Sequence, residues 1–243
     1  MKAELRINEA LDAVALGKQL QANRRLQIEN FLPPASAEEL YALLRSNTDW
    51  FVAYNKGAEG FDVPLADMQA LPAEERQRFY QNVNKRAAVQ FQYCFLQYYI
   101  TESKRRGDNP GHPLHVVDDF VNGADWLAFM RTLTGEPAVC AADALASRYS
   151  AGHFLTDHSD AHARHDRVAA FVISLTKDWN RNWGGHLVFF DEHGNIEQGF
   201  APRFNTLNIF LVPQAHAVQA VTPFAAGART SITGWLHRTP PGA

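Results

Sequence analysis

The sequence contains little cysteine and no long apolar run. Only Cys94 and Cys140 occur among 243 residues, which argues against a disulfide scaffold and predicts two buried, reduced thiols. No stretch approaches the roughly 18 apolar residues of a membrane-spanning helix. The first twenty residues include acidic side chains and no apolar core of signal-peptide length. These absences predict a cytoplasmic protein that does not associate with membranes.

An excess of basic residues is also missing. The formal net charge is −3 at pH 7, whereas nucleic-acid binders generally carry a broad basic face. Direct nucleic-acid binding is therefore not expected, and the only basic cluster spans residues 104–106. Hydrophobic residues make up 46% and charged residues 20% of the chain. This balance predicts a folded globular chain without extended disorder.

The first half of the chain has the spacing of helices. Apolar residues recur at helical intervals, which predicts helices over residues 7–22, 37–45, 73–101 and 120–133. The third of these is crowded with aromatic side chains, which would pack the helix onto a sheet or line a substrate channel. Residues 104–113 are rich in Gly, Pro, Asp and Asn, which predicts a mobile lid.

From residue 141 onward the spacing changes to that of strands. Strands are predicted over residues 144–149, 168–175, 186–190, 204–212, 216–221 and 229–237, with a hairpin turn at residues 191–195. Many strands preceded by helices predict a mainly β fold, a double-stranded β-helix (jelly roll) core buttressed by N-terminal helices. We treat residues 1–243 as one domain, in which residues 1–140 supply helical support and substrate-side elements and residues 141–238 form the core.

Three residues are candidate metal ligands. His158 and Asp160 lie two positions apart where a predicted strand runs into a loop, and on an extended chain such residues project to one side. His216, on a distant strand, would complete a set of two imidazoles and one carboxylate. This facial set suits non-haem Fe(II) and leaves coordination positions open for a second substrate and O2.

An anion-binding pair follows the third ligand. Arg229 and Ser231 lie two positions apart on the last predicted strand, so their side chains are on the same face. An arginine fork and a hydroxyl on the same face suit the distal carboxylate of a dicarboxylate co-substrate.

Together these motifs resemble the 2-oxoglutarate and Fe(II)-dependent oxygenases of the prolyl-hydroxylase type. The resemblance is carried by Tyr149, His158-Ser-Asp160, the run that begins Trp183-Gly-Gly-His, His216 and Arg229-Thr-Ser-Ile-Thr-Gly-Trp-Leu-His237. Within that group the chain is most similar to the catalytic domain of the ribosomal-protein prolyl 3-hydroxylases. The similarity covers residues 140–238 and, more faintly, residues 28–33. Residues 50–140 match no family pattern.

The resemblance implies an enzyme, a 2-oxoglutarate-dependent dioxygenase that uses Fe(II), 2-oxoglutarate and O2, with ascorbate as a supporting reductant. It implies hydroxylation of a C–H bond with release of succinate and CO2, and no catalytic residue beyond the metal centre. Arg229 would bind the distal carboxylate, with Ser231 and Tyr149 donating hydroxyls. Relatives often carry a tyrosine where this chain has Ser174, so one contact to the co-substrate is in doubt.

The implied substrate is a prolyl residue in an exposed protein loop, with a ribosomal protein as the candidate partner. The basic residues 104–106 would face an acidic or RNA-adjacent surface. Residue patterns alone do not indicate the oligomeric state.

Three alternatives stay open. A hydroxylase of free amino acids or small metabolites would need a second carboxylate-binding arginine near the iron, for which the candidates are Arg148, Arg164, Arg167 and Arg203. A non-catalytic binding or sensor domain could use the same fold. His162 and His165 could instead complete a zinc site in a hydrolase, although that enzyme would need a general base that the sequence does not identify.

Overall fold

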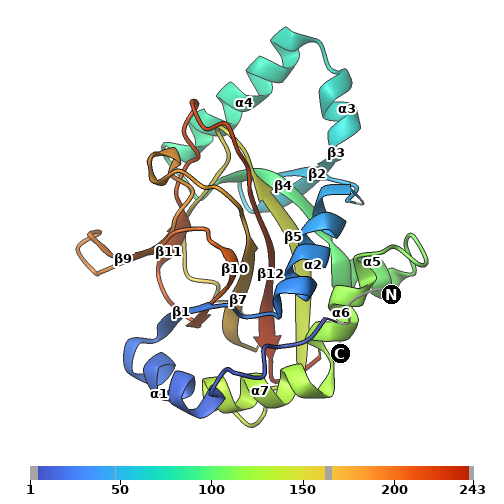
Figure 1. Ribbon diagram of the computed structural model, residues 1–243. Helices are drawn as coiled ribbons and strands as arrows, with labels where there is room; N and C mark the ends of the chain where they lie inside the picture. The colour runs from blue at the N-terminus through green and yellow to red at the C-terminus, as the bar shows by residue number, and fades with distance from the viewer. Residues whose placement is uncertain (1–4, 47, 162–165, 241–243) are drawn as a thin grey trace.

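The computed structural model describes residues 5–46, 48–161 and 166–240. A curved antiparallel sheet forms a nearly closed barrel, with helices against its outer side (Figure 1). The helices are α1 Ala13–Asn23, α2 Pro34–Ser46, α3 Leu65–Ala70, α4 Ala73–Ala87, α5 Ile100–Arg106, α6 His115–Val121 and α7 Ala124–Thr134. The strands are β1 Arg25–Glu29, β2 Phe51–Lys56, β3 Glu59–Pro64, β4 Tyr93–Tyr99, β5 Ala141–Tyr149, β6 Phe154–His158, β7 Arg167–Leu175, β8 Leu187–Phe190, β9 Ile196–Phe200, β10 Phe204–Leu211, β11 His216–Val218 and β12 Arg229–His237. None of the described helices is long and apolar enough to cross a bilayer.

The strand order confirms the predicted jelly-roll core. Strands β10, β7, β12 and β5 form one wall, β6, β11, β8 and β9 form the other, and β4 joins β5 to β6. The turn predicted at residues 191–195 joins β8 to β9, which pair antiparallel. Strand β1 adds to the edge of the first wall through β10, so the N-terminal half supplies strands to the sheet as well as helices.

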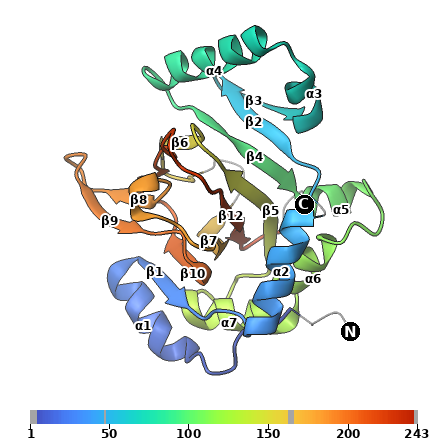
Figure 2. The ribbon, with the colours of Figure 1, turned by 45° about the horizontal axis from the view of Figure 1, so that its top comes forward.

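Strand alternation separates the barrel interior, which contains the candidate site, from an apolar outer core. On β12, Ile232 and Leu236 are fully buried in the main hydrophobic cluster beneath the helices. Trp126 of α7 packs edge-to-face against Phe31 and Phe171, with ring centroids 5.7 Å and 5.1 Å apart. Helices α2, α5, α6 and α7 therefore pack on the outer face of this wall (Figure 2), and the candidate site lies on its interior face.

Gly234 is the point at which β12 and its neighbours pack most closely. A Cβ there would lie 1.9 Å from the Asp143 carbonyl oxygen and 2.6 Å from the Phe171 ring. We expect Gly234→Ala to lower the free energy of unfolding by about 3 kcal/mol, measured by urea denaturation. Gly199→Ala is the matched control because its Cβ would meet only Val188, at an ordinary 3.5 Å. Equal stability of the two variants would contradict this packing.

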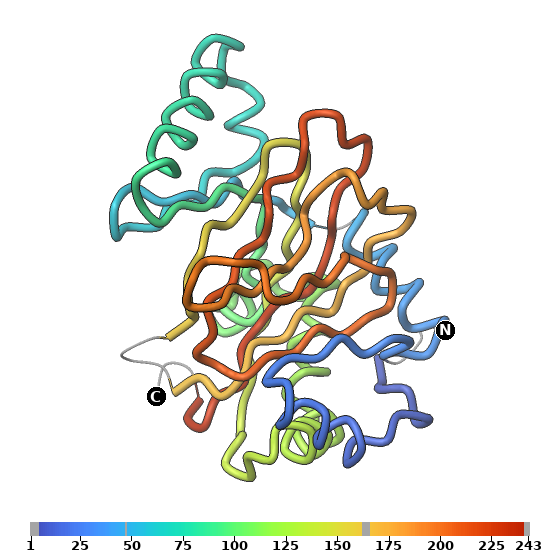
Figure 3. Tube along the Cα trace, turned by 90° about the vertical axis from the view of Figure 1, so that its left-hand side faces the viewer, coloured from blue at the N-terminus to red at the C-terminus, as the bar shows by residue number. Residues whose placement is uncertain are grey.

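The helix predicted over residues 73–101 is wrong in its second half. Helix α4 ends at Ala87, and the aromatic run forms β4. Phe91, Tyr93 and Phe95 recur at every second position, which is the period of a strand. Cys94 and Leu96 face a small core with α3 and α4, while Phe95 faces the barrel. Helices α3 and α4 project beyond the barrel on the far side of β4 (Figure 3).

Two smaller predictions also differ from the structure. The helix expected over residues 120–133 is split into α6 and α7 around Gly123. Both cysteines are free, as expected, but Cys140 is exposed and only Cys94 is buried.

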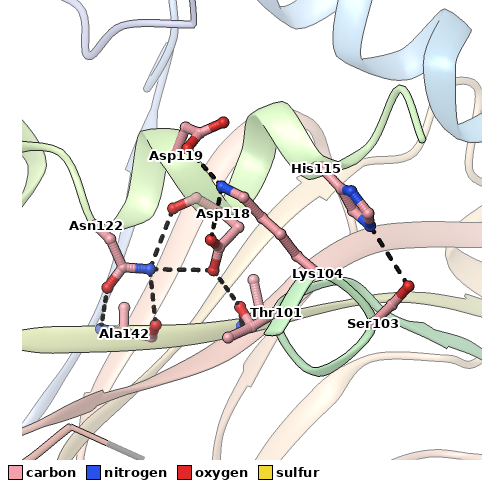
Figure 4. A network of polar contacts seen from close by, with 9 residues as sticks. Thr101, Ser103, Lys104, His115, Asp118, Asp119, Asn122 and Ala142 are labelled. Atoms are coloured by element: carbon pink, nitrogen blue, oxygen red, sulfur yellow. Dashed lines mark hydrogen bonds and ion pairs between the residues drawn. The ribbon is translucent and has the colours of Figure 1, made fainter. Parts of the chain in front are cut away.

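The lid predicted over residues 104–113 is also wrong. Lys104 lies in the last turn of α5 and binds Asp118 and Asp119 of α6 at 3.0 Å and 2.5 Å, and His115 lies 3.4 Å from the Ser103 hydroxyl (Figure 4). The arginines at positions 105 and 106 both pair with Glu102. The basic cluster is thus largely neutralised by acids, and no residue of 104–113 lines the cavity that holds the candidate metal ligands.

Candidate metal and co-substrate site

The structure brings the three predicted metal ligands together. His158 ends β6, His216 begins β11, and the two are paired across these neighbouring strands. The Nε2 atoms of His158 and His216 lie 3.3 Å and 3.5 Å from the two carboxylate oxygens of Asp160. One ligand atom from each residue lies within 4.8 Å of the others. This compact His-Asp-His set could hold a metal ion.

Asp160 reaches the histidines through a backbone turn. Strand β6 stops at His158, and Asp160 has a φ of 59°, in the left-handed region that aspartate tolerates better than most residues. The Arg167 guanidinium donates a hydrogen bond of 3.2 Å to the Asp160 carbonyl. The pair is therefore positioned by a left-handed turn, and not by the extended spacing on which the sequence prediction relied.

Backbone carbonyls orient both imidazoles. The Nδ1 of His158 lies 3.0 Å from the carbonyl oxygen of Thr156, and the Nδ1 of His216 lies 2.8 Å from that of Gln214. A carbonyl only accepts, so each Nδ1 carries the proton and donates it. Each Nε2 therefore presents a lone pair toward Asp160, which is the form that a metal ligand requires.

Burial and charge keep the set in its ligand-ready state. Burial lowers the pKa of His216 to about 4, and the neighbouring His158 adds to that effect. Burial favours the neutral acid of Asp160, but contacts with His158 and His216 outweigh it and hold the pKa of the carboxyl below its usual range. Near neutral pH the site thus combines a neutral His216 imidazole with a carboxylate.

Arg229 lies in the same cavity as the three ligands. This cavity has a volume of about 80 Å³. Arg229 is 3% exposed and begins β12 opposite Tyr149, whose ring centroid is 5.1 Å from the guanidinium carbon. Its Nε and Nη1 have no hydrogen-bond partner among the described residues. Burial lowers the pKa of Arg229 and raises that of Tyr149. A buried cation with unused donors requires an anion.

A row of hydroxyls crosses the barrel wall next to Arg229. Ser147, Ser231 and Ser174 are aligned across β5, β12 and β7 and are all buried. The Ser147 and Ser231 hydroxyl oxygens are 2.8 Å apart, while that of Ser174 has no partner in the part of the chain that the structure describes. Ser147 was not predicted as a site residue, although its position two residues before Tyr149 places it on the same face.

Trp235 and Arg167 lie beside the candidate metal ligands. Trp235 lines the metal cavity. The guanidinium carbon of Arg167 lies 4.0 Å from the Trp235 ring centroid, and the Arg167 Nη1 lies 4.0 Å from the Asp160 carboxylate. The Trp235 indole N–H also contributes to the lowered pKa of Asp160 through a side-chain hydrogen bond, while the Nε of Arg167 is buried without a hydrogen-bond partner among the described residues.

Of the arginines predicted as candidates for binding a substrate carboxylate, Arg167 is the one among the described residues that lies near the metal ligands. Arg203 pairs with Glu29 on the surface. Arg148 lines a separate groove and not the metal cavity. Arg164 lies outside the described residues, as do His162 and His165, on which the zinc alternative depends.

An aromatic strip leads from the surface into the cavity. Ring centroids along β4 are 5.8 Å apart for Phe91 and Tyr93 and 5.7 Å apart for Tyr93 and Phe95. Phe95 stacks on Tyr149 at 4.7 Å and lines the cavity. Phe91 is 44% exposed, and its centroid lies 5.7 Å from that of His158. The strip therefore forms an open apolar surface beside a candidate metal ligand.

Comparisons with known proteins agree with this geometry. Residues 144–237 match the model of the 2OG-Fe(II) oxygenase superfamily. No curated protein sequence matches the chain.

Solved structures with the same fold cover nearly the whole chain. A prolyl-4-hydroxylase from Pseudomonas putida has a TM-score of 0.61 at 19% identity, covering 93% of this chain and 99% of its own. A 2OG-Fe(II) oxygenase family oxidoreductase from Burkholderia pseudomallei has a TM-score of 0.61 at 17% identity, covering 98% and 96%. A prolyl hydroxylase from Trichoplax adhaerens, in complex with a hypoxia inducible factor peptide fragment, has a TM-score of 0.60 at 16% identity, covering 93% and 89%.

The matched segment contains the His158 and Asp160 pair, His216 and Arg229, and the fold around them is that of the solved oxygenases. The matched segment thus carries the core of the 2OG-Fe(II) oxygenase superfamily, and this match together with the His-Asp-His set supports a 2-oxoglutarate-dependent dioxygenase that uses Fe(II), 2-oxoglutarate and O2.

Proposed function

We propose that this dioxygenase hydroxylates a prolyl residue in a protein and converts 2-oxoglutarate and O2 into succinate and CO2. The observation that carries the proposal is that the His-Asp-His set and the buried Arg229, which has two unpaired donors, line the same cavity. A metal ligand set alone would also suit a hydrolase, and a buried arginine alone would suit an anion-binding module. Their combination in one small cavity suits an iron-bound dicarboxylate.

Each residue has an assigned role. His158, Asp160 and His216 hold Fe(II), and Arg229 binds the distal carboxylate of 2-oxoglutarate through its two unused donors. Tyr149 and Ser231 supply hydroxyls beside it. When bound, the metal supplies the activation of O2 and of the 2-oxo acid. The chain's own contribution is to orient the co-substrate and to exclude water from a largely apolar cavity.

The aromatic strip supports a prolyl substrate. Proline-containing peptides bind to aromatic-lined grooves in several unrelated domains, and Phe91 and Tyr93 present such a surface next to His158. The resemblance to ribosomal-protein prolyl 3-hydroxylases makes an exposed ribosomal protein loop the first candidate, encountered in the cytoplasm. We assign the whole of residues 1–243 to one oxygenase domain, since β1–β4 complete the sheet around the site.

A second candidate function rests on Arg167. Its guanidinium lies beside the metal ligands with one unpaired buried donor, where it could bind the carboxylate of a free amino acid or small metabolite. The same side chain is already stacked on Trp235 and bonded to the backbone of Asp160. These contacts favour a role in supporting Asp160 over a role in substrate binding.

The deciding experiment compares substrates directly. Anaerobically purified protein is loaded with Fe(II) and 2-oxoglutarate and exposed to O2 with proline-containing ribosomal peptides or with free proline. Mass spectrometry should detect one added oxygen on a peptide prolyl residue together with stoichiometric succinate. Hydroxylation of free proline, but of no peptide, would overturn the protein-substrate assignment in favour of the second candidate.

Phe91→Ala tests the aromatic strip. We expect the rate of peptide hydroxylation at low peptide concentration to fall by about tenfold, because an exposed aromatic contact of roughly 1 to 2 kcal/mol is lost. Decarboxylation of 2-oxoglutarate without peptide should not change, since the side chain lies outside the co-substrate end of the cavity. Phe224→Ala removes an even more exposed phenylalanine, 67% exposed, and serves as the control. Equal peptide kinetics for the two variants would remove the strip from the substrate site.

A further inference from the structure

A second concavity lies on the outer side of the barrel wall, between that wall and helix α2. We call it the cationic groove. Its volume is about 590 Å³, and its walls are formed by the C-terminal half of α2, the end of β5 and the two residues after it, Lys177 after β7, residues 225–228 and the start of β12. Its polar lining consists of Tyr41, Arg45, Arg148, Ser150, Lys177 and Thr230.

The groove contains more cationic side chains than carboxylates that pair with them. Lys177 pairs with Glu38 at 2.6 Å and also lies 4.6 Å from the Tyr41 ring centroid. Arg45 donates a 2.9 Å hydrogen bond to the Tyr41 hydroxyl. Arg148 has no carboxylate within ion-pair distance among the described residues. Three cations therefore share one carboxylate, in a chain whose net charge is −3.

Such an arrangement favours an anion. Like charges around a concave surface repel one another, and a bound anion converts that repulsion into attraction. Arg148 and Arg45 offer planar forks that match oxyanion groups, and Ser150 and Thr230 add hydroxyls on the same walls. The volume of the groove lies in the range of small-molecule sites and exceeds that needed for a single inorganic ion.

The groove is separate from the co-substrate site. Arg148 precedes Tyr149 on β5, and Thr230 follows Arg229 on β12. Across the two strands Tyr149 is paired with Arg229, and Arg148 is paired with Thr230. Neighbouring residues of a strand point to opposite faces of the sheet. The same two strands therefore present Tyr149 and Arg229 to the metal cavity and Arg148 and Thr230 to the groove.

We propose that the cationic groove is a second binding site, for a small molecule that carries at least two negative charges on phosphate or carboxylate groups. The proposal does not depend on the identity of the hydroxylated substrate. Arg148 is its central residue because it is unpaired and half-buried, so an anion there gains the most from a charge-assisted hydrogen bond.

Isothermal titration of the full chain with inorganic pyrophosphate and, separately, with tricarballylate tests the site. We expect at least one probe to bind, and Arg148→Gln to raise its dissociation constant by about tenfold or more, as the loss of a charged hydrogen bond implies. Arg78→Gln, an exposed charge on α4, should bind like the parent. Arg229→Lys should also leave the titration unchanged, since it alters only the co-substrate end of the cavity.

The outcomes separate the sources of the anion. Binding of pyrophosphate alone identifies a phosphorylated ligand, and binding of tricarballylate alone identifies a polycarboxylate. Arg148→Lys, which retains the charge, should bind between the parent and Arg148→Gln, and equal melting temperatures exclude unfolding as the cause. Absence of binding by both probes, or loss of binding only in Arg229→Lys, would overturn the proposal. If a short RNA binds far more tightly than either probe, and if this binding depends on Arg148, the ligand of the groove is a nucleic acid and the small-molecule proposal is overturned.

Discussion

Asp160→Asn is expected to abolish Fe(II)-dependent decarboxylation of 2-oxoglutarate while the protein stays folded. The amide keeps the shape of the side chain and, like aspartate, tolerates the left-handed φ of 59° at this position. It removes the only carboxylate among the three ligands. Changes to residues that merely support metal ligands cost about 10- to 100-fold in affinity or activity, so we expect a loss of more than about 100-fold here.

Two measurements make this test specific. An anaerobic Fe(II) titration should show weaker metal binding by Asp160→Asn, and thermal unfolding without metal should show no loss of stability, because the variant no longer buries a carboxylate. Asp160→Ala should lose activity equally, but its melting temperature should fall slightly, since alanine is strained at positive φ. Asp157→Asn, an exposed neighbour on β6, is the control. Full turnover by Asp160→Asn would remove the assignment of this metal site.

Arg229→Lys is expected to weaken the apparent affinity for 2-oxoglutarate by about tenfold or more. Lysine retains the positive charge but loses the planar fork, and a tenfold change corresponds to about 1.4 kcal/mol. The effect should appear in the 2-oxoglutarate concentration that half-saturates decarboxylation, with a smaller change in the rate at saturation. It follows from burial, because the two unpaired donors of Arg229 have no access to water as an alternative partner.

Arg148→Lys provides the matched comparison for Arg229. It makes the same exchange on the neighbouring strand, one residue from Tyr149 but on the opposite face of the sheet. Its half-saturating concentration of 2-oxoglutarate should equal that of the parent. If Arg229→Lys also binds 2-oxoglutarate as tightly as the parent, the carboxylate lies elsewhere, and Arg167 becomes the first position to examine.

The jelly-roll core and the candidate metal set were predictable from the sequence because both follow from short-range patterns. Strand alternation marks which residues of β12 face inward, and the residue types of His158, Asp160 and His216 specify a chemistry before any geometry is known. The matching of His158 to His216 across β6 and β11 was not predictable. It depends on strand pairing between segments that are far apart in the chain.

The remaining differences have physical causes. Strand β4 was mistaken for helix because aromatic residues occur in both, and only their period of two distinguishes the strand. The segment at residues 104–113 has the composition of a lid, but its first three residues belong to α5, which Lys104 ties to α6, and none of its residues lines the metal cavity. Arg167 and Trp235 lie beside Asp160 only in the folded chain, and no local pattern in the sequence records that proximity.

The backbone hydrogen bonds of the two histidines determine where this metal centre can be altered. Each Nδ1 donates to a main-chain carbonyl two residues upstream, at Thr156 and Gln214, and no side-chain substitution deletes a main-chain carbonyl. Replacement of side chains around the imidazoles therefore leaves both hydrogen-bond acceptors in place. We expect substitutions that alter metal preference or redox behaviour to occur on the carboxylate side of the centre. There the neighbours of Asp160 are the side chains of Arg167 and Trp235, which substitution can change.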